Sequence, residues 1–156
     1  MSSKKAGGSI ANETGNILEN FVEQTLIRKG YEFIPKNKFT VSLSLNQKIY
    51  TRQQIIAQTI YNSKWNVDFT IHNPNNTPIS LIIECKWQQV GGSVDEKYPY
   101  TVANIKEQSP YPAIILLDGG GYKSGAEQWI KKQIDSKLIG VFNMGEFTKW
   151  ANLGNI

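Results

Sequence analysis

The stretch Trp65–Trp87, WNVDFTIHNPNNTPISLIIECKW, decides the fold of this chain. Apolar and polar residues alternate over 65–72, which predicts a strand with one buried face. The segment 73–78, NPNNTP, is rich in turn-forming residues. A β-rich run over 79–87 follows it. The stretch is therefore predicted to form two antiparallel strands joined by a turn.

The turn determines which side chains of the two strands face each other. If Asn73 pairs with Ile79, the same register places Asp68 directly opposite Glu84. Lys86 lies two residues after Glu84 and so shares its face of the strand. Opposed residues have Cβ atoms about 4.5–5.5 Å apart. The two carboxylates would then repel each other unless a positive charge lay between them.

Two carboxylates and one ammonium on a single strand face are suited to holding a hard divalent cation. Mg²⁺ prefers oxygen ligands and keeps several of its waters, and Mn²⁺ is the expected substitute. The backbone carbonyl of Cys85 lies between Glu84 and Lys86 in the chain and is a further candidate ligand. A bound cation of this kind polarises a phosphodiester and lowers the pKa of a bound water. Lys86 could then position or deprotonate that water.

Less specific interpretations of these residues stay open. Asp68, Glu84 and Lys86 could form an ordinary ion pair on an exposed sheet face. The only histidine, His72, falls at the end of the hairpin, where a surface role is favoured over a catalytic one. The glycines at 119–121 lack the G-x-x-x-x-G-K-[ST] spacing of a phosphate-binding loop and indicate a flexible loop.

The rest of the chain predicts one α/β domain. Residues 1–14 are small, polar and basic, which indicates a flexible basic arm ahead of a domain over 15–156. Helical spacing of apolar residues predicts helices over 15–29, 95–108, 126–137 and 146–153. Strands are predicted over 31–34, 39–45, 65–72, 79–87, 111–118 and 138–143, while 47–64 fits a strand or a short helix. This order predicts a mixed central β-sheet flanked by helices.

Composition narrows the class of protein further. The chain has 156 residues, with 17 Lys and Arg against 13 Asp and Glu, a formal net charge of +4. A positive balance is compatible with an anionic partner such as nucleic acid. No apolar run approaches the ~20 residues that span a bilayer, and the first residues lack the apolar core of a secretory signal. The single cysteine excludes a disulfide framework. We expect a cytoplasmic protein without a membrane segment.

These residues resemble the signature of a known family. Asp68, followed by ECK at 84–86 and by Gln88, resembles the PD-(D/E)XK nuclease motif in its E-x-K-x-Q form. Glu19 in the first predicted helix matches a glutamate of the family that often joins the metal shell. The segment 91–100, GGSVDEKYPY, is similar to the segment after the motif in several restriction endonucleases. The resemblance covers roughly residues 15–143.

The resemblance implies a restriction-endonuclease-like fold and Mg²⁺-dependent hydrolysis of DNA phosphodiester bonds. The implied catalytic residues are Glu19, Asp68, Glu84, Lys86 and Gln88. The implied metal ligands are Asp68, Glu84 and the Cys85 carbonyl, with Glu19 acting through water. Lys97, Ser93, Lys123 and Arg52 are the candidate contacts to DNA.

The biological task implied by the resemblance has alternatives. A small, site-specific type II restriction enzyme is the first expectation, and it would act as a homodimer because cutting both strands needs two sites. A homing endonuclease, a junction resolvase or a repair nuclease of the same fold is the second. A non-catalytic DNA-binding module that keeps the fold is the third.

Overall fold

The computed structural model describes residues 7–156, which form six strands and five α-helices. The strands are β1 (Glu32–Phe33), β2 (Ile49–Gln58), β3 (Lys64–His72), β4 (Ser80–Trp87), β5 (Ala113–Asp118) and β6 (Leu138–Phe142). The α-helices are α1 (Gly7–Arg28), α2 (Lys36–Ser42), α3 (Tyr98–Gln108), α4 (Ser124–Lys131) and α5 (Met144–Trp150). Short 3-10 helices cover Leu43–Leu45 and Asp95–Lys97, and a π-helical turn covers Ala151–Asn155.

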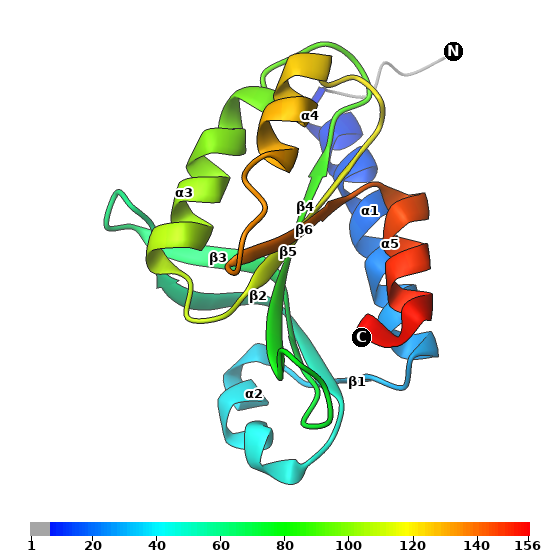
Figure 1. The fold of residues 1–156 in the computed structure, drawn as a ribbon, viewed down its shortest axis with the longest axis vertical. Coiled ribbons are helices and arrows are strands. Elements are labelled where there is room, and N and C mark those ends of the chain that lie inside the picture. The colour runs from blue at the N-terminus through cyan, green and yellow to red at the C-terminus, as the bar shows by residue number, and fades with distance from the viewer. Residues whose placement is uncertain (1–6) are drawn as a thin grey trace.

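The strands form one mixed sheet in the order β1-β2-β3-β4-β5-β6. The pairs β2–β3 and β3–β4 are antiparallel, whereas β1–β2, β4–β5 and β5–β6 are parallel. Helices α1 and α5 cover one face of the sheet, and α3 and α4 cover the other (Figure 1). This arrangement confirms the predicted single α/β domain with a mixed central sheet.

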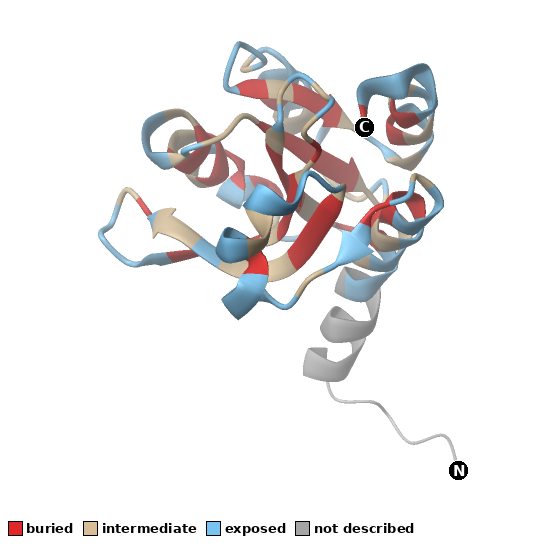
Figure 2. Ribbon diagram, turned by 90° about the horizontal axis from the view of Figure 1, so that it is seen from below, coloured by how far each residue is buried: buried red, intermediate tan, exposed pale blue. Residues whose placement is uncertain are grey.

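Each face of the sheet has its own hydrophobic core. Leu18 and Val22 of α1 pack with Ile83 of β4 on one face, and Val102 and Ile105 of α3 pack in the core of the other. Buried strands therefore lie between helices whose outer faces are exposed (Figure 2). Because β5 is covered on both sides, its sequence is apolar from Ala113 to Leu117, as parallel strands in such sheets are, whereas β4 carries Glu84 and Lys86 among its apolar residues.

Two predictions at the start of the chain are wrong in detail. Helix α1 begins at Gly7, so residues 7–14 of the predicted arm are helical, while residues 1–6 of it lie outside the described residues. The predicted strand over 39–45 is helix α2 followed by a 3-10 turn. Pro35 caps α2 with φ −54°, and only Phe39 of the helix is buried, so the alternating apolar pattern there reflects exposed residues and not a sheet face.

Other predicted elements are confirmed with shifted ends. The ambiguous segment 47–64 contains β2, and the predicted helix over 95–108 is a 3-10 turn followed by α3, with Pro99 in the first turn of α3. Helix α4 ends at Lys131, earlier than the predicted end at residue 137, and Trp129 and Ile134 are substantially exposed. Among the described residues, no helix combines the length and the apolar character needed to cross a bilayer.

Candidate active site

The site lies where β3 and β4 separate. The two strands pair from His72↔Ser80 to Phe69↔Ile83, which confirms the register predicted from the turn. Asn73 donates its backbone N–H to the Ile79 carbonyl at 2.8 Å, and this bond closes the turn. Beyond Ile83, β4 continues beside β5 as far as Trp87, whereas the first half of β3 stays paired with β2. A cleft opens between the two halves of the sheet.

Asp68 sits at the point of separation. Its Oδ2 accepts a hydrogen bond from the backbone N–H of Cys85 at 2.8 Å. In an unbroken ladder that N–H would bond to the next paired residue of β3, Val67, so the Asp68 carboxylate replaces a backbone acceptor. Val67 and Phe69 pack into opposite cores although they are two residues apart. The alternation of β3 is therefore interrupted at Asp68, opposite Gln53 of β2, whose φ is +54°.

Glu84 is the most buried charged group of the site. Its exposed fraction is 5%, and its Oε1 has no hydrogen-bond partner among the described residues. The Lys86 ammonium lies 3.6 Å from the other oxygen, Oε2. Burial, with a smaller contribution from repulsion by Asp68, raises the pKa of Glu84 to about 8, although Lys86 counteracts both. A cation near Asp68 and Glu84 would relieve this cost.

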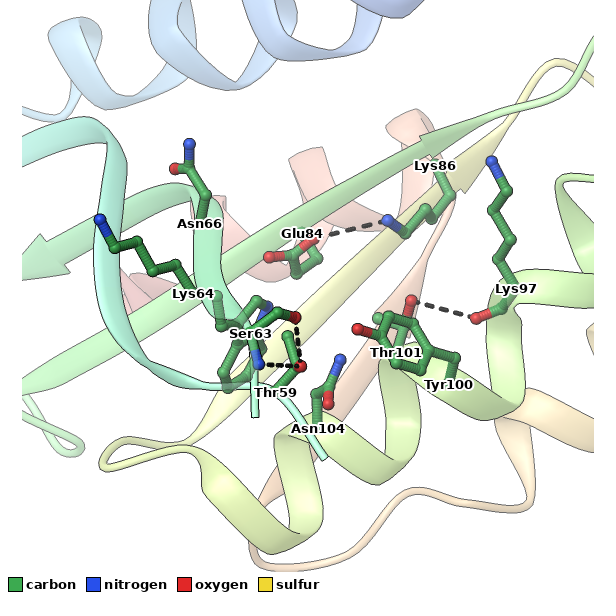
Figure 3. Close-up of a pocket in the computed structure, with 11 residues that line it drawn as sticks. Thr59, Ser63, Lys64, Asn66, Glu84, Lys86, Lys97, Tyr100, Thr101 and Asn104 are labelled. Atoms are coloured by element: carbon green, nitrogen blue, oxygen red, sulfur yellow. Dashed lines mark hydrogen bonds and ion pairs between the residues drawn. The ribbon is translucent and has the colours of Figure 1, made fainter. Parts of the chain in front are cut away.

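The cleft has a volume of about 310 Å³ and joins three elements (Figure 3). The end of β2 and the start of β3 form one wall, β4 supplies Glu84 and Lys86, and α3 forms the opposite wall. The lining residues are Thr59, Ser63, Lys64, Trp65, Asn66, Glu84, Lys86, Lys97, Tyr100, Thr101 and Asn104. Three lysines therefore surround one buried carboxylate, which favours an anionic ligand held next to a cation.

The donor set at the separation fits a hard divalent cation. A buried carboxylate oxygen without a partner is costly unless a cation or water satisfies it. Within residues 7–156, no cluster of three or more His, Cys, Asp and Glu side chains could hold a metal ion. Protein ligands beyond Asp68 and Glu84 would therefore have to be neutral oxygens, from the backbone or from amide and hydroxyl side chains, with water and substrate completing the shell, as is usual for Mg²⁺.

Glu19 lies near Asp68, but its carboxylate forms an ion pair with a residue of β2. Its carboxylate pairs with the Arg52 guanidinium, which also binds Glu23 at 2.8 Å. Arg52 in turn lies over the ring of Phe69, 5.2 Å from its centroid. Burial and repulsion by Asp68 raise the pKa of Glu19, and Arg52 opposes this effect. Arg52, predicted to contact DNA, is thus an internal counter-ion of α1.

Gln88 is buried beside the site and bonds to two loops. Its Nε2 donates to the Gly121 carbonyl at 3.1 Å, and its Oε1 accepts from the Asp95 N–H at 2.9 Å. The Gly121 N–H also donates to the Gln88 carbonyl at 2.7 Å. A Cβ on Gly119 or Gly121 would collide with the backbone of this segment. The glycine run predicted as a flexible loop therefore packs closely against the end of β4.

The remaining predicted positions fall at different distances from the site. Lys97 lines the cleft. Ser93 and Lys123 are exposed and do not line it; the Lys123 N–H donates to the buried carboxylate of Asp95 at 3.1 Å. His72 bonds to Ser80 at 2.9 Å, outside the site. The side chain of Cys85 packs against the core on the α1 face.

The polar residues of α3 that lie opposite Glu84 were not predicted from the sequence. Asn104 is 2% exposed, and its Oδ1 accepts the N–H of Ile60 at 2.9 Å, which ties the β2–β3 turn to α3. Tyr100 and Thr101 line the cleft one turn earlier in α3. A buried asparagine in an apolar helical stripe was the available signal, because such a residue needs a partner from another element.

The sheet is mixed, and two of its central strands, β3 and β4, separate beside Asp68, Glu84 and Lys86. The sequence model of the PD-(D/E)XK nuclease superfamily domain matches residues 10–154. The chain therefore belongs to the PD-(D/E)XK nuclease superfamily, whose members generally use divalent metals such as Mg²⁺. No curated protein and no solved structure matches the chain.

Proposed function

We propose that this nuclease domain is a Mg²⁺-dependent DNA endonuclease with Asp68, Glu84 and Lys86 at its centre. The observation that supports this best is the buried Glu84 carboxylate, one oxygen unpartnered and the other 3.6 Å from Lys86. Such a carboxylate is poor at stabilising the fold but well placed to bind a cation. The lysines of the cleft supply the positive field that a phosphodiester requires.

The residues divide the reaction between them. Asp68, Glu84 and the Cys85 carbonyl would hold the cation, which when bound would polarise the phosphodiester and acidify a water. Lys86 orients the attacking water and balances the negative charge that develops on the phosphoryl oxygens. The water oxygen forms a new P–O bond and releases its proton to solvent, one P–O ester bond breaks, and the leaving oxygen takes up a proton from solvent. Glu19 and Gln88 act indirectly, Glu19 through water and Gln88 through the two loops it joins.

We further propose that the enzyme is of the site-specific restriction type and acts as a homodimer. Residues 7–156 contain one Asp68–Glu84–Lys86 set, and cutting both strands of a duplex needs two such sets. Resolvases, homing and repair nucleases, and a non-catalytic DNA-binding module, are the competing assignments. The intact triad argues against the last, because DNA binding alone does not require it.

A plasmid assay tests the proposal. Supercoiled DNA is incubated with wild type in Mg²⁺, in Mn²⁺ or in EDTA, and with Lys86→Ala in Mg²⁺. We expect wild type to cleave the DNA in Mg²⁺ and in Mn²⁺. We expect no cleavage in EDTA or by Lys86→Ala. Linear product formed without a nicked intermediate would support a dimer that cuts both strands. Cleavage by Lys86→Ala at the wild-type rate, or absence of cleavage under all conditions, would refute the proposed function.

A further inference from the structure

A stacked pair of tyrosines, one of them exposed, stands at the rim of the cleft. Tyr61 of the β2–β3 turn stacks on Tyr100 of α3, with ring centroids 5.2 Å apart and an interplanar angle of 23°. Tyr100 also lines the cleft, whereas Tyr61 is 75% exposed. One ring therefore packs against the protein while much of the other is open to solvent. An exposed π-face beside an anionic-ligand cleft is suited to stack on a nucleobase.

The turn that carries Tyr61 is held in place by several hydrogen bonds. The Thr59 hydroxyl lies 2.7 Å from the Ser63 hydroxyl and accepts the Tyr61 N–H at 3.2 Å. The neighbouring Ile60 N–H is bonded to the buried Asn104. A ring fixed in this way loses little conformational entropy when a base stacks on it. The geometry is thus prepared before any ligand arrives.

Two lysines flank the tyrosine pair on the cleft walls. Lys64 at the start of β3 and Lys97 just before α3 both line the cleft and are exposed. In the described part of the chain, neither has a carboxylate within ion-pair distance. Figure 3 shows Lys97 on the side of Lys86 and Lys64 on the opposite side of Glu84. Phosphates on both sides of the reacting one could therefore be neutralised.

We propose that the cleft takes an unpaired nucleotide of the strand being cut, with its base stacked on the Tyr61–Tyr100 pair. The flanking phosphates would contact Lys64 and Lys97. A base exposes its π-face in this way only when it leaves the helical stack. The cleft volume of about 310 Å³ is that of a small-ligand pocket and not of a duplex. This inference rests on the proposed function and adds the class of DNA that it acts on.

Binding measured in EDTA tests the inference without cleavage. Three labelled DNAs are compared: a fully paired duplex, the same duplex with a short unpaired flap, and the single strand. Wild type is expected to bind the flap DNA about tenfold more tightly than the duplex, the gain of one stacked base. Tyr61→Ala should lose that gain, Tyr61→Phe should keep it, and Tyr61→Leu should lose it although it keeps an apolar contact with Tyr100.

A surface truncation distant in the fold is the control. Leu153→Ala removes an 82% exposed side chain near the C-terminus and should bind all three DNAs like wild type. A 2-aminopurine at the unpaired position reports stacking directly: its fluorescence should fall on binding to wild type and to Tyr61→Phe, and not to Tyr61→Ala. A Tyr61 effect on the paired duplex as well would mean that the base is extruded from it, which also supports the inference.

Two outcomes would overturn it. The first is that wild type binds flap and paired DNA with equal affinity and that Tyr61→Ala binds both with the affinity of wild type. The second is a Tyr61→Phe protein as weak as Tyr61→Ala, since a phenyl ring stacks as well as a phenol. Metal-dependent plasmid cleavage alongside either result would leave the proposed function standing and reject this inference alone. Absence of cleavage with intact flap binding would reject the proposed function alone.

Discussion

The Asp68 carboxylate accepts the backbone N–H of Cys85 at 2.8 Å, at the residue where β3 stops pairing with β4. This one bond fixes a charged side chain next to Glu84 and leaves the other carboxylate oxygen facing Gln53, 3.3 Å from its Nε2. The bond needs an acceptor but not a charge. Structure and metal binding at Asp68 can therefore be separated by substitution.

Asp68→Asn should remain folded and lose activity. The amide oxygen can still accept the Cys85 N–H, whereas the negative charge for the cation is gone. We expect cleavage to fall at least about 100-fold with little change in melting temperature. Asp68→Ala should lose both the negative charge and the hydrogen-bond acceptor. Its free energy of unfolding should therefore also fall by about 1–3 kcal/mol, because the buried Cys85 N–H has no partner. Equal melting temperatures for the two variants would contradict this reading of the bond.

Glu84 should make the metal-free protein less stable as pH rises. Its pKa is about 8 in the folded protein against an ordinary value of 4.5. Between these values the folded state keeps a proton that the unfolded state has lost. The stability that this proton contributes is fully present below about pH 4.5 and is lost as pH rises through about 8. Glu84→Gln should show a flatter dependence of melting temperature on pH in EDTA. A wild type that gains stability from this group between pH 5 and 8 would contradict the assignment.

The same proton should compete with the cation. Below about pH 8 a divalent ion must displace it, so Mg²⁺ affinity should fall by up to about tenfold per pH unit. Activity at subsaturating Mg²⁺ should therefore rise with pH and level off. Saturating Mg²⁺ should shift that rise to lower pH, because the bound ion favours the ionised carboxylate. An activity profile whose midpoint is independent of Mg²⁺ would count against this competition.

Gln88→Ala should act on stability more than on chemistry. It removes a partly buried bond to the Gly121 carbonyl and a buried bond to the Asp95 N–H. Unsatisfied buried groups of this kind cost about 1–3 kcal/mol. We expect a lower melting temperature and, well below it, cleavage close to that of wild type. An unchanged melting temperature with a large loss of kcat would instead mean that Gln88 touches the reacting groups.

Arg52 should matter to stability through Glu19. Arg52→Met leaves Glu19, Glu23 and Asp68 to repel one another, and we expect a loss of about 1 kcal/mol for this half-exposed cluster. Combining it with Glu19→Gln should recover part of the loss. A double-mutant cycle by chemical denaturation measures the coupling. Additive effects would show that the pair does not interact.

The core of the site could be predicted because a short local rule controls it. Once Asn73 pairs with Ile79, the register of an antiparallel hairpin follows as far as Phe69↔Ile83, and Asp68 and Glu84 are the next residues along the two strands. The separation of β3 from β4 could not be predicted in the same way. It depends on the interruption of β3 at Asp68, which is visible only once both cores are packed.

Other parts depend on contacts between distant segments. The pairing of Arg52 with Glu19 joins α1 to β2, and the bonds of Gln88 join two loops. Residues 39–45 alternate like a strand but form a helix, because Pro35 caps it and only Phe39 needs burial. In each case the local pattern is compatible with two structures, and tertiary packing selects one.

The central claim is that Asp68 and Glu84 together hold a divalent cation beside Lys86. Titration with Mn²⁺, followed by electron paramagnetic resonance on wild type, Asp68→Asn and Glu84→Gln at pH 8.5, measures it directly. Wild type should bind the ion, and each substitution should weaken binding by at least about tenfold, since each removes a charged ligand. Unchanged Mn²⁺ affinity in both variants would contradict the account.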